Sequence, residues 1–97
     1  MKRGYVYILS NYTRTTFYIG VTSKLGPRFD EHQAGVGSKF VRKYNLKYLV
    51  YYEVFDRIED AIRREKQLKK WHRAWKIRLI KSVNAEMRDL SEEIPWQ

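Results

Sequence analysis

The sequence contains no cysteine, so the chain can form neither a disulfide nor a thiolate zinc site, and it has no cysteine nucleophile. Histidine is scarce as well. The chain has two histidines in 97 residues, and they do not form a pair at the spacing of a usual zinc site. Thiol chemistry and histidine-based zinc sites are therefore excluded.

Long apolar runs are also absent, since no stretch approaches the roughly 18 residues needed to span a bilayer. The first residues lack a basic and then apolar leader before a small-residue cleavage site. We therefore expect a cytoplasmic protein with no membrane partner. A length of 97 residues and a hydrophobic content of 43% suffice for one core and exclude a second independent domain.

Acidic residues are few compared with basic ones, 11 against 20, which gives a net charge of +9. Such a surface favours a polyanionic partner, because each cation placed against a phosphate releases condensed counterions. Nucleic acid is the leading interpretation. A basic surface that only keeps the chain soluble, or that touches anionic lipid, is the alternative.

The charge is unevenly distributed along the chain. Nine of the basic residues fall between residues 63 and 81, where Glu65 is the one acid, whereas residues 84–97 carry four acids against Arg88. We therefore expect a basic domain over residues 1–83 and an acidic C-terminal tail over residues 84–97. The side chains predicted to bind nucleic acid are Arg28, Lys39, Arg42, Lys43, Arg64, Lys69, Lys70 and Arg73.

Aromatic and β-branched residues predict three strands, over residues 5–9, 17–21 and 48–55, the first two forming a hairpin. Helices are expected after the second strand and twice after the third, the last over residues 74–83. The state of residues 39–43 stays open. The predicted class is α+β, a small three-stranded, largely antiparallel β-sheet flanked by helices in the order β-β-α-β-α-α.

Local signals predict where the first two helices begin and where the first of them ends. Pro27 suits the first turn of a helix that Gly35 ends. Asp56 and Glu59 have the spacing of a capping box at the start of a long helix over residues 57–70.

Glu65 breaks the pattern of this long helix, because it lies in the middle of the stripe that must be buried. An ionised carboxylate there costs several kcal/mol unless a cation or donors compensate it. Two explanations remain open, an ion pair with Lys69 or Arg28 and a metal ligand. The apolar positions that define the stripe are Ile58, Ala61, Ile62 and Leu68.

Arg28 and His32 are four residues apart on the first helix and therefore lie on one face. An arginine fork matches a phosphate, and a histidine transfers protons near neutral pH. Both side chains could address one phosphate. An exposed pair of this spacing is nevertheless usually a solvated helix face.

Tyrosines are concentrated in the hairpin, where side chains alternate between the two faces of the sheet. Tyr5 and Tyr7 share one face of the first strand, and Tyr18 shares one face of the second strand with Gly20. A glycine inside a strand indicates that another group approaches the backbone closely. Two phenols could meet over a site, and core packing is the alternative.

Trp71 and Trp75 end the long helix and begin the next one. We expect them to anchor these two helices to each other, with base stacking as the alternative.

Gly4-Tyr5-Val6-Tyr7, Tyr18-Ile19-Gly20, the Arg28-x-x-x-His32 helix and Glu65 resemble, as an ordered set, the GIY-YIG nuclease superfamily. The chain is similar to small stand-alone bacterial members related to the N-terminal nuclease domain of the UvrABC excinuclease C subunit. The resemblance covers residues 4 to about 81. Two departures are the glycine of the first motif, shifted to Gly4, and Val21, where the excision nuclease carries a lysine.

The resemblance implies a metal-dependent endonuclease of low sequence specificity, acting on DNA rather than RNA, and it suggests a role in DNA repair or recombination. It implies that Tyr7 and Tyr18 are the motif tyrosines, Tyr7 being the first choice for general base with help from His32 or Tyr18. Arg28 would bind phosphate, and Glu65 would hold Mg²⁺ or Mn²⁺. The tyrosine pKa would have to be lowered by Arg28 and the metal to act at neutral pH.

Two other classes of function compete with catalysis. One is a basic nucleic-acid-binding module on the same fold with little or no activity. The other is a protein-interaction or assembly factor, which would leave the run of cations unexplained.

Overall fold

The computed structural model describes residues 2–93 of the chain, and its centre is a three-stranded antiparallel sheet. Strand β1 (Gly4–Ser10) lies between β2 (Phe17–Thr22) and β3 (Tyr48–Phe55). The predicted α+β class and element order are confirmed. The unassigned stretch is a short helix, α2 (Lys39–Lys43), in which the Ser38 hydroxyl accepts the N–H of Val41 at 3.3 Å.

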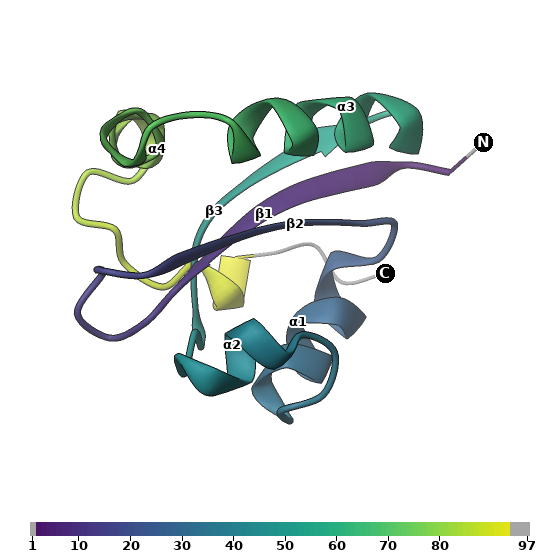
Figure 1. Cartoon of the computed structure of the whole chain (residues 1–97). Coiled ribbons are helices and arrows are strands. Elements are labelled where there is room, and N and C mark those ends of the chain that lie inside the picture. The colour runs from purple at the N-terminus through teal and green to yellow at the C-terminus, as the bar shows by residue number, and fades with distance from the viewer. Residues whose placement is uncertain (1, 94–97) are drawn as a thin grey trace.

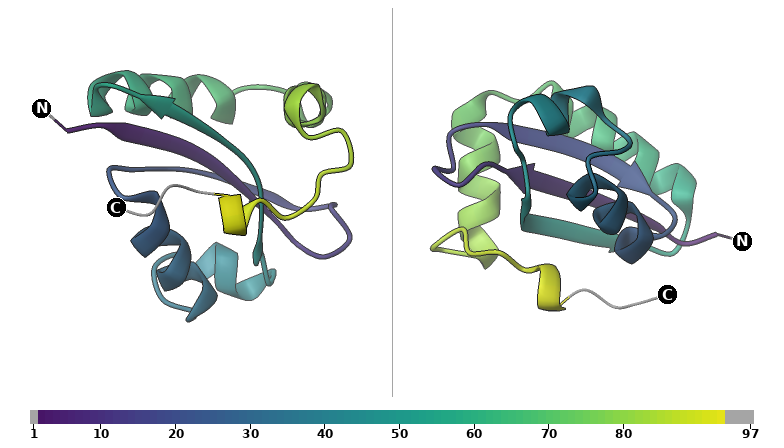
Figure 2. Two further views of the ribbon diagram at one scale, coloured as in Figure 1. Left: turned by 180° about the vertical axis from the view of Figure 1, so that it is seen from behind. Right: turned by 90° about the horizontal axis from the view of Figure 1, so that it is seen from below.

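Helices cover both faces of the sheet, as Figures 1 and 2 show. Helices α1 (Leu25–Gln33) and α2 lie on one face, and α3 (Ile58–Lys69) and α4 (Arg73–Val83) lie on the other. The alternation of β1 matches this division, since Tyr5, Tyr7 and Leu9 pack with α1 residues while Val6 and Ile8 pack with α3 and α4 residues. None of the helices within residues 2–93 is both long and apolar enough to cross a membrane.

The start of α3 differs from the sequence-based prediction. Arg57 is the N-cap residue and makes no side-chain capping bond, so the predicted capping box of Asp56 and Glu59 is wrong. The N–H of Ile58 instead donates to the carbonyl of Lys2 at 2.9 Å. The segment leading into β1 therefore satisfies a donor that the sequence assigned to a local side chain.

The apolar stripe of α3 is narrower than predicted. Ala61 and Leu68 are fully buried, but Ile62 is 38% exposed. The face of α3 that packs on the sheet is therefore centred on Ala61 and Leu68, and Ile62 lies at its margin.

The described part of the acidic C-terminal stretch packs along β3. The Asn84 side-chain amide donates to the Val50 carbonyl at 3.0 Å, and the Leu90 N–H donates to the Leu49 carbonyl at 2.7 Å. The Leu90 side chain is buried in the core. The domain boundary at residue 83 stays a prediction, and residues 94–97 lie outside the described part.

Candidate active site

The Tyr7 side chain of β1 meets His32 of α1 in the core. The Tyr7 hydroxyl lies 3.0 Å from Nε2 of His32, and the two residues are 1% and 2% exposed. A hydrogen bond in such a poorly solvated place is electrostatically stronger than one in water. Within the described part of the chain, Nδ1 of His32 is buried without a hydrogen-bond partner, so the hydrogen bond to Tyr7 is the one that orients the ring.

Gly20 makes room for Tyr7 from the neighbouring strand. The two residues are direct partners in the antiparallel register, and a Cβ atom built on Gly20 would lie 2.3 Å from Cζ and Oη of Tyr7. The close approach that a strand glycine indicates is therefore confirmed, and the approaching group is the Tyr7 ring. Any larger residue at this position would displace the phenol from His32.

Tyr18 completes an aromatic cluster with these two side chains. Its ring centroid lies 6.3 Å from that of Tyr7 and 5.8 Å from that of His32. Both explanations left open for the hairpin tyrosines hold in part, since Tyr7 and Tyr18 meet on one face while Tyr5 and Tyr7 also belong to the buried core. Tyr18 is partly exposed, whereas Tyr7 is nearly covered, so Tyr18 is the tyrosine that borders solvent.

Arg28 lies one turn before His32 on α1 and forms an ion pair with Glu31, Nε to Oε1 at 3.0 Å. Both side chains of this pair are substantially exposed, 41% and 54%. Exposed pairs of this kind contribute about 0 to 1 kcal/mol. The guanidinium can therefore exchange Glu31 for an anionic ligand at little cost.

Burial sets the protonation of the Tyr7 and His32 pair. It raises the pKa of Tyr7 well above its usual value, and the neighbouring Tyr18 adds to this while Arg28 opposes it. It lowers the pKa of His32, with Arg28 adding to the effect. Arg28 lowers the pKa of Tyr7 as expected, but in the protein alone desolvation outweighs the guanidinium, so the net pKa of Tyr7 is raised.

Glu65 lies on α3, the layer opposite to α1. Its side chain is 13% exposed and pairs with Lys69, Oε2 to Nζ at 2.8 Å. Of the two ion-pair partners considered from sequence, Lys69 is therefore the one present, and Arg28 pairs elsewhere. Within residues 2–93, no hydrogen bond or ion pair joins Glu65 to the cluster of Tyr7, Tyr18, Arg28 and His32.

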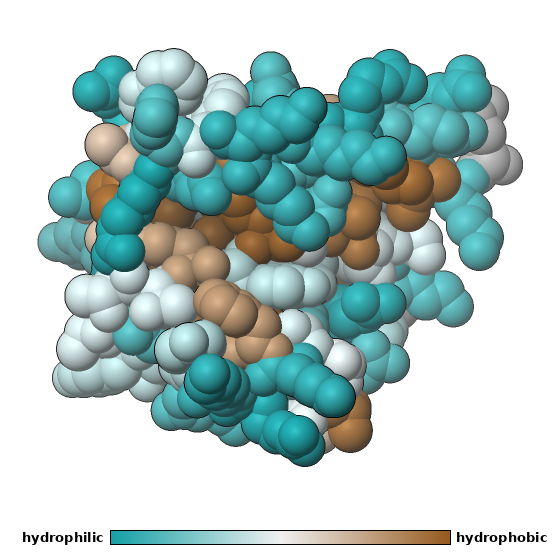
Figure 3. All heavy atoms as spheres, viewed as in Figure 1, coloured by the Kyte–Doolittle hydropathy of each residue, from teal (hydrophilic) through white to brown (hydrophobic). Residues whose placement is uncertain are grey.

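A groove of about 280 Å³ along β2 connects the two layers. Figure 3 shows a band of hydrophobic residues across the middle of the molecule, with mostly hydrophilic residues above and below it. Tyr18 and Lys69 both line the groove, so the tyrosine cluster and the partner of Glu65 share one depression. The full lining is Phe17, Tyr18, Ile19, Phe40, Lys69 and Lys76.

Sequence reasoning missed Phe40 and Lys76 as site residues. Lys76 was one of nine cations in its run, and nothing in its spacing distinguishes it from the others. Phe40 was in the stretch left unassigned, and its ring lies 6.3 Å from that of Tyr18 while 42% of the residue stays exposed. For Phe40, the available signal in the sequence was an aromatic residue flanked by the basic residues of 39–43.

The donor set suits one kind of metal ion. Within the described residues no three or more His, Asp or Glu side chains gather into a cage, and Glu65 provides one largely buried carboxylate. Mg²⁺ is commonly held by one or two carboxylates together with waters and substrate phosphate oxygens. Glu65 therefore fits Mg²⁺ or the similar Mn²⁺, and does not fit an ion that needs an all-protein cage.

The predicted nucleic-acid-binding cations are not equivalent in the structure. Those of α2 (Lys39, Arg42 and Lys43) are exposed, as is Lys70. The guanidinium of Arg73 lies over the Phe17 ring at 5.6 Å, beside the groove. The Arg64 side chain is 24% exposed and donates to both carboxylate oxygens of Glu53, from Nε and from Nη2 at 3.0 Å each. The charge of Arg64 is therefore compensated by Glu53.

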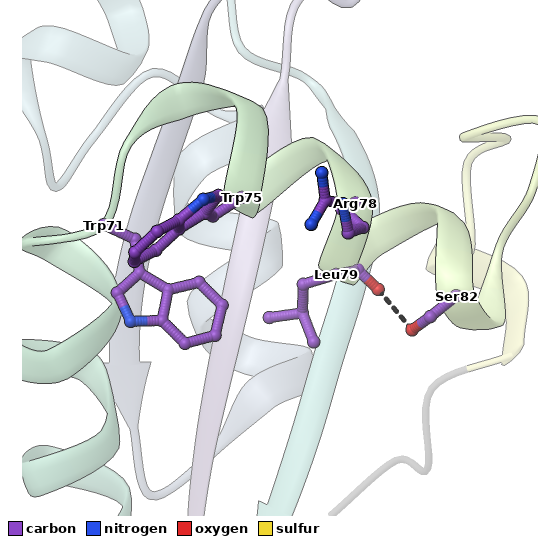
Figure 4. Close-up of a pocket in the computed structure, with 5 residues that line it drawn as sticks. All are labelled: Trp71, Trp75, Arg78, Leu79 and Ser82. Atoms are coloured by element: carbon purple, nitrogen blue, oxygen red, sulfur yellow. Dashed lines mark hydrogen bonds between the residues drawn. The ribbon is translucent and has the colours of Figure 1, made fainter.

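The two tryptophans hold the junction of α3 and α4, as predicted. Their rings pack edge to face with centroids 5.9 Å apart, and Figure 4 shows them together with Leu79 and Arg78 around a shallow depression. The Arg64 guanidinium lies over the Trp71 ring at 5.3 Å. These contacts support the anchoring interpretation over base stacking for Trp71, while Trp75 remains 49% exposed.

Comparisons with known proteins agree with this geometry. Residues 3–78 match the family described as GIY-YIG catalytic domain. A UPF0213 protein of Syntrophus aciditrophicus is 38% identical over 82 residues, which are 84% of this chain and 93% of that protein. A UPF0213 protein of Natronomonas pharaonis is 41% identical over 76 residues, 78% of this chain and 88% of that protein.

A solved structure is similar as well. The solution NMR structure of the UPF0213 protein from Bacillus halodurans matches with a TM-score of 0.55 at 30% sequence identity. The match covers 84% of this chain and 86% of that one. The likeness therefore extends over nearly the whole of both proteins.

Proposed function

The chain belongs to the GIY-YIG catalytic domain family, and we propose that it is an endonuclease that hydrolyses phosphodiester bonds in nucleic acid with a divalent metal ion. DNA is the favoured substrate, and low sequence specificity is expected because the proposed contacts address phosphates rather than base edges. The observation that carries the proposal is the buried hydrogen bond between Tyr7 and His32 beside Tyr18 and Arg28.

This bond provides a way to remove a proton from water without a free phenolate. As the Tyr7 oxygen takes a proton from the attacking water, its own proton passes to Nε2 of His32. His32 suits this role because burial keeps its pKa low and its imidazole neutral. Water must be admitted beside the buried Tyr7 hydroxyl when substrate binds, and Tyr18 borders the groove from which it would come.

Arg28 and Glu65 have complementary roles on the phosphate. The Arg28 fork binds its oxygens once it leaves Glu31. A Mg²⁺ or Mn²⁺ ion on Glu65 would supply electrostatic stabilisation of the charge that builds on those oxygens and on the leaving group.

The test is incubation of the purified protein with branched, nicked and linear DNA and RNA, with and without Mg²⁺ or Mn²⁺. We expect cleavage that requires a divalent ion and favours a DNA substrate. If the protein binds nucleic acid but does not cleave it with any metal or substrate tried, the proposed nuclease activity is wrong. The alternative, a non-catalytic nucleic-acid-binding module, would then hold. Cleavage in the absence of a divalent ion would contradict the metal-binding role of Glu65 and would leave the tyrosine cluster as the catalytic site.

A further inference from the structure

Lys69 lies between two features of the candidate site, the Glu65 carboxylate and the groove along β2. Its ammonium is 2.8 Å from the Glu65 carboxylate, and its side chain also lines the groove that holds Tyr18. Lys69 is 52% exposed while Glu65 is 13% exposed, so the lysine can move and the carboxylate is held in place. One cation therefore lies between the proposed metal ligand and the proposed path of the phosphate backbone.

The ion pair is required by the surroundings of Glu65. The carboxylate lies on the side of α3 that carries the fully buried Ala61 and Leu68, and Lys69 is its one ion-pair or hydrogen-bond partner within residues 2–93. A mostly buried anion without a cation is costly. Lys69 therefore compensates Glu65 as long as no other cation does.

We propose that Lys69 is a replaceable counter-ion that links metal binding to substrate binding. The same Glu65 oxygen cannot be shared freely by an ammonium and a divalent ion, because the two cations repel each other. A phosphate in the groove offers Lys69 a second anionic partner. Lys69 then exchanges the carboxylate for the phosphate, and Glu65 becomes available, so each ligand promotes binding of the other. This inference rests on the proposed function, in which Glu65 holds the metal.

The first measurement is Mn²⁺ affinity without nucleic acid, read from the electron paramagnetic resonance signal of free Mn²⁺. Lys69→Met removes the competing charge and should tighten Mn²⁺ binding by about 5- to 10-fold. Lys69→Arg keeps the charge and should bind Mn²⁺ as weakly as wild type. Lys76→Met is the matched control, since Lys76 lines the same groove without an ion pair to Glu65. It should change the affinity less than about twofold.

The second measurement repeats the titration with a short DNA duplex, in a Tyr7→Phe background that keeps the DNA intact. DNA should raise the Mn²⁺ affinity in every protein that retains Glu65, because phosphate oxygens add ligands. The factor by which DNA raises the Mn²⁺ affinity should be several-fold smaller with Lys69→Met than with Lys76→Met. The reason is that the Lys69→Met variant has no ammonium that could move from Glu65 to the phosphate.

The outcomes separate this inference from the proposed function. If Glu65→Gln abolishes Mn²⁺ binding while Lys69→Met leaves it as in wild type, Lys69 is only a helix ion pair, the inference fails and the metal assignment stands. If Glu65→Gln binds Mn²⁺ as well as wild type, the metal assignment itself fails and takes the inference with it. Tighter binding in Lys69→Met alone supports both.

Discussion

The two faces of the sheet are built from the same three strands but have opposite chemistry. Toward α1, β1 presents Tyr7, which hydrogen-bonds to a buried histidine. Toward α3 and α4 it presents Val6 and Ile8, which pack on an apolar core. The hydrogen-bonded phenol and histidine thus lie on one face, and the Glu65 carboxylate and several cations lie in the layer over the other. The groove along β2 is where the two sets meet.

The two faces also differ in how firmly their polar side chains are held. The tyrosine and histidine are rigid because they are buried and hydrogen-bonded. On the other face, Lys69 and Lys70 at the end of α3 are exposed, so their side chains can adapt to an anionic ligand. Substitutions of the buried groups should therefore lower the cleavage rate, and substitutions of the exposed cations along α3 and α4 should lower the affinity for nucleic acid.

The largest effect is expected from Arg28. Arg28→Ala should lower the single-turnover cleavage rate at saturating protein by about 10² to 10³, the usual cost of losing one preorganised donor. Arg28→Lys should recover little of this, because an ammonium lacks the two-pronged geometry. Arg57→Ala is the control, since Arg57 is an exposed arginine at the start of α3 whose ion-pair partner is Glu59. Wild-type rates in both Arg28 variants would restrict Arg28 to ground-state binding.

A smaller effect is expected for the groove cations, and in affinity rather than rate. The logarithm of DNA affinity should fall linearly with the logarithm of salt concentration, with a slope of about −0.9 per phosphate contact on duplex DNA. Lys76→Met should make that slope shallower by about 0.9, which corresponds to the loss of one phosphate contact. Lys47→Met should not, because the Lys47 ammonium donates to the Gln33 carbonyl outside the groove. Equal slopes for the two variants would show that DNA does not bind along the groove.

The smallest effect is a pH dependence of stability from His32. Its pKa is lowered in the folded protein, first by burial and then by Arg28, so the unfolded chain binds the proton more readily. The stabilisation is complete above about pH 6.5 and is lost as pH falls through the folded-state pKa. Urea unfolding should therefore show a decreasing free energy of unfolding in acid, and His32→Gln should flatten the curve. An unchanged curve in His32→Gln, or the same flattening in His72→Gln, would contradict this assignment.

Much of the fold was predictable because the signals are local. The three strands follow from their aromatic and β-branched residues, and Gly35, at a φ of +83°, ends α1 as glycines do. The start of α3 was not predictable, since the carbonyl that satisfies Ile58 belongs to Lys2, more than fifty residues away. The same holds for Leu90, whose backbone partner on β3 no local pattern indicates.

The members of the aromatic cluster were predictable, but the protonation of Tyr7 was not. Strand alternation predicted that Tyr7 and Tyr18 could meet, and helix spacing placed Arg28 and His32 on one face of α1. Only the family resemblance joined the tyrosines to His32. The protonation of Tyr7 was not predictable, because it depends on how completely the ring is buried. The groove was missed because it is made by β2, α2, α3 and α4 together, and no sequence pattern reports which side chains of separate elements line one depression.

The most direct test of the account is whether both faces act on one phosphodiester bond. Single-turnover cleavage should be measured at saturating protein and Mg²⁺ for wild type, Tyr7→Phe and Glu65→Gln, after circular dichroism has shown that all three fold. The account predicts that each substitution lowers the saturated rate by at least about 10², because each removes a group that acts in the transition state. A wild-type rate in either variant would show that its face of the sheet takes no part in the reaction.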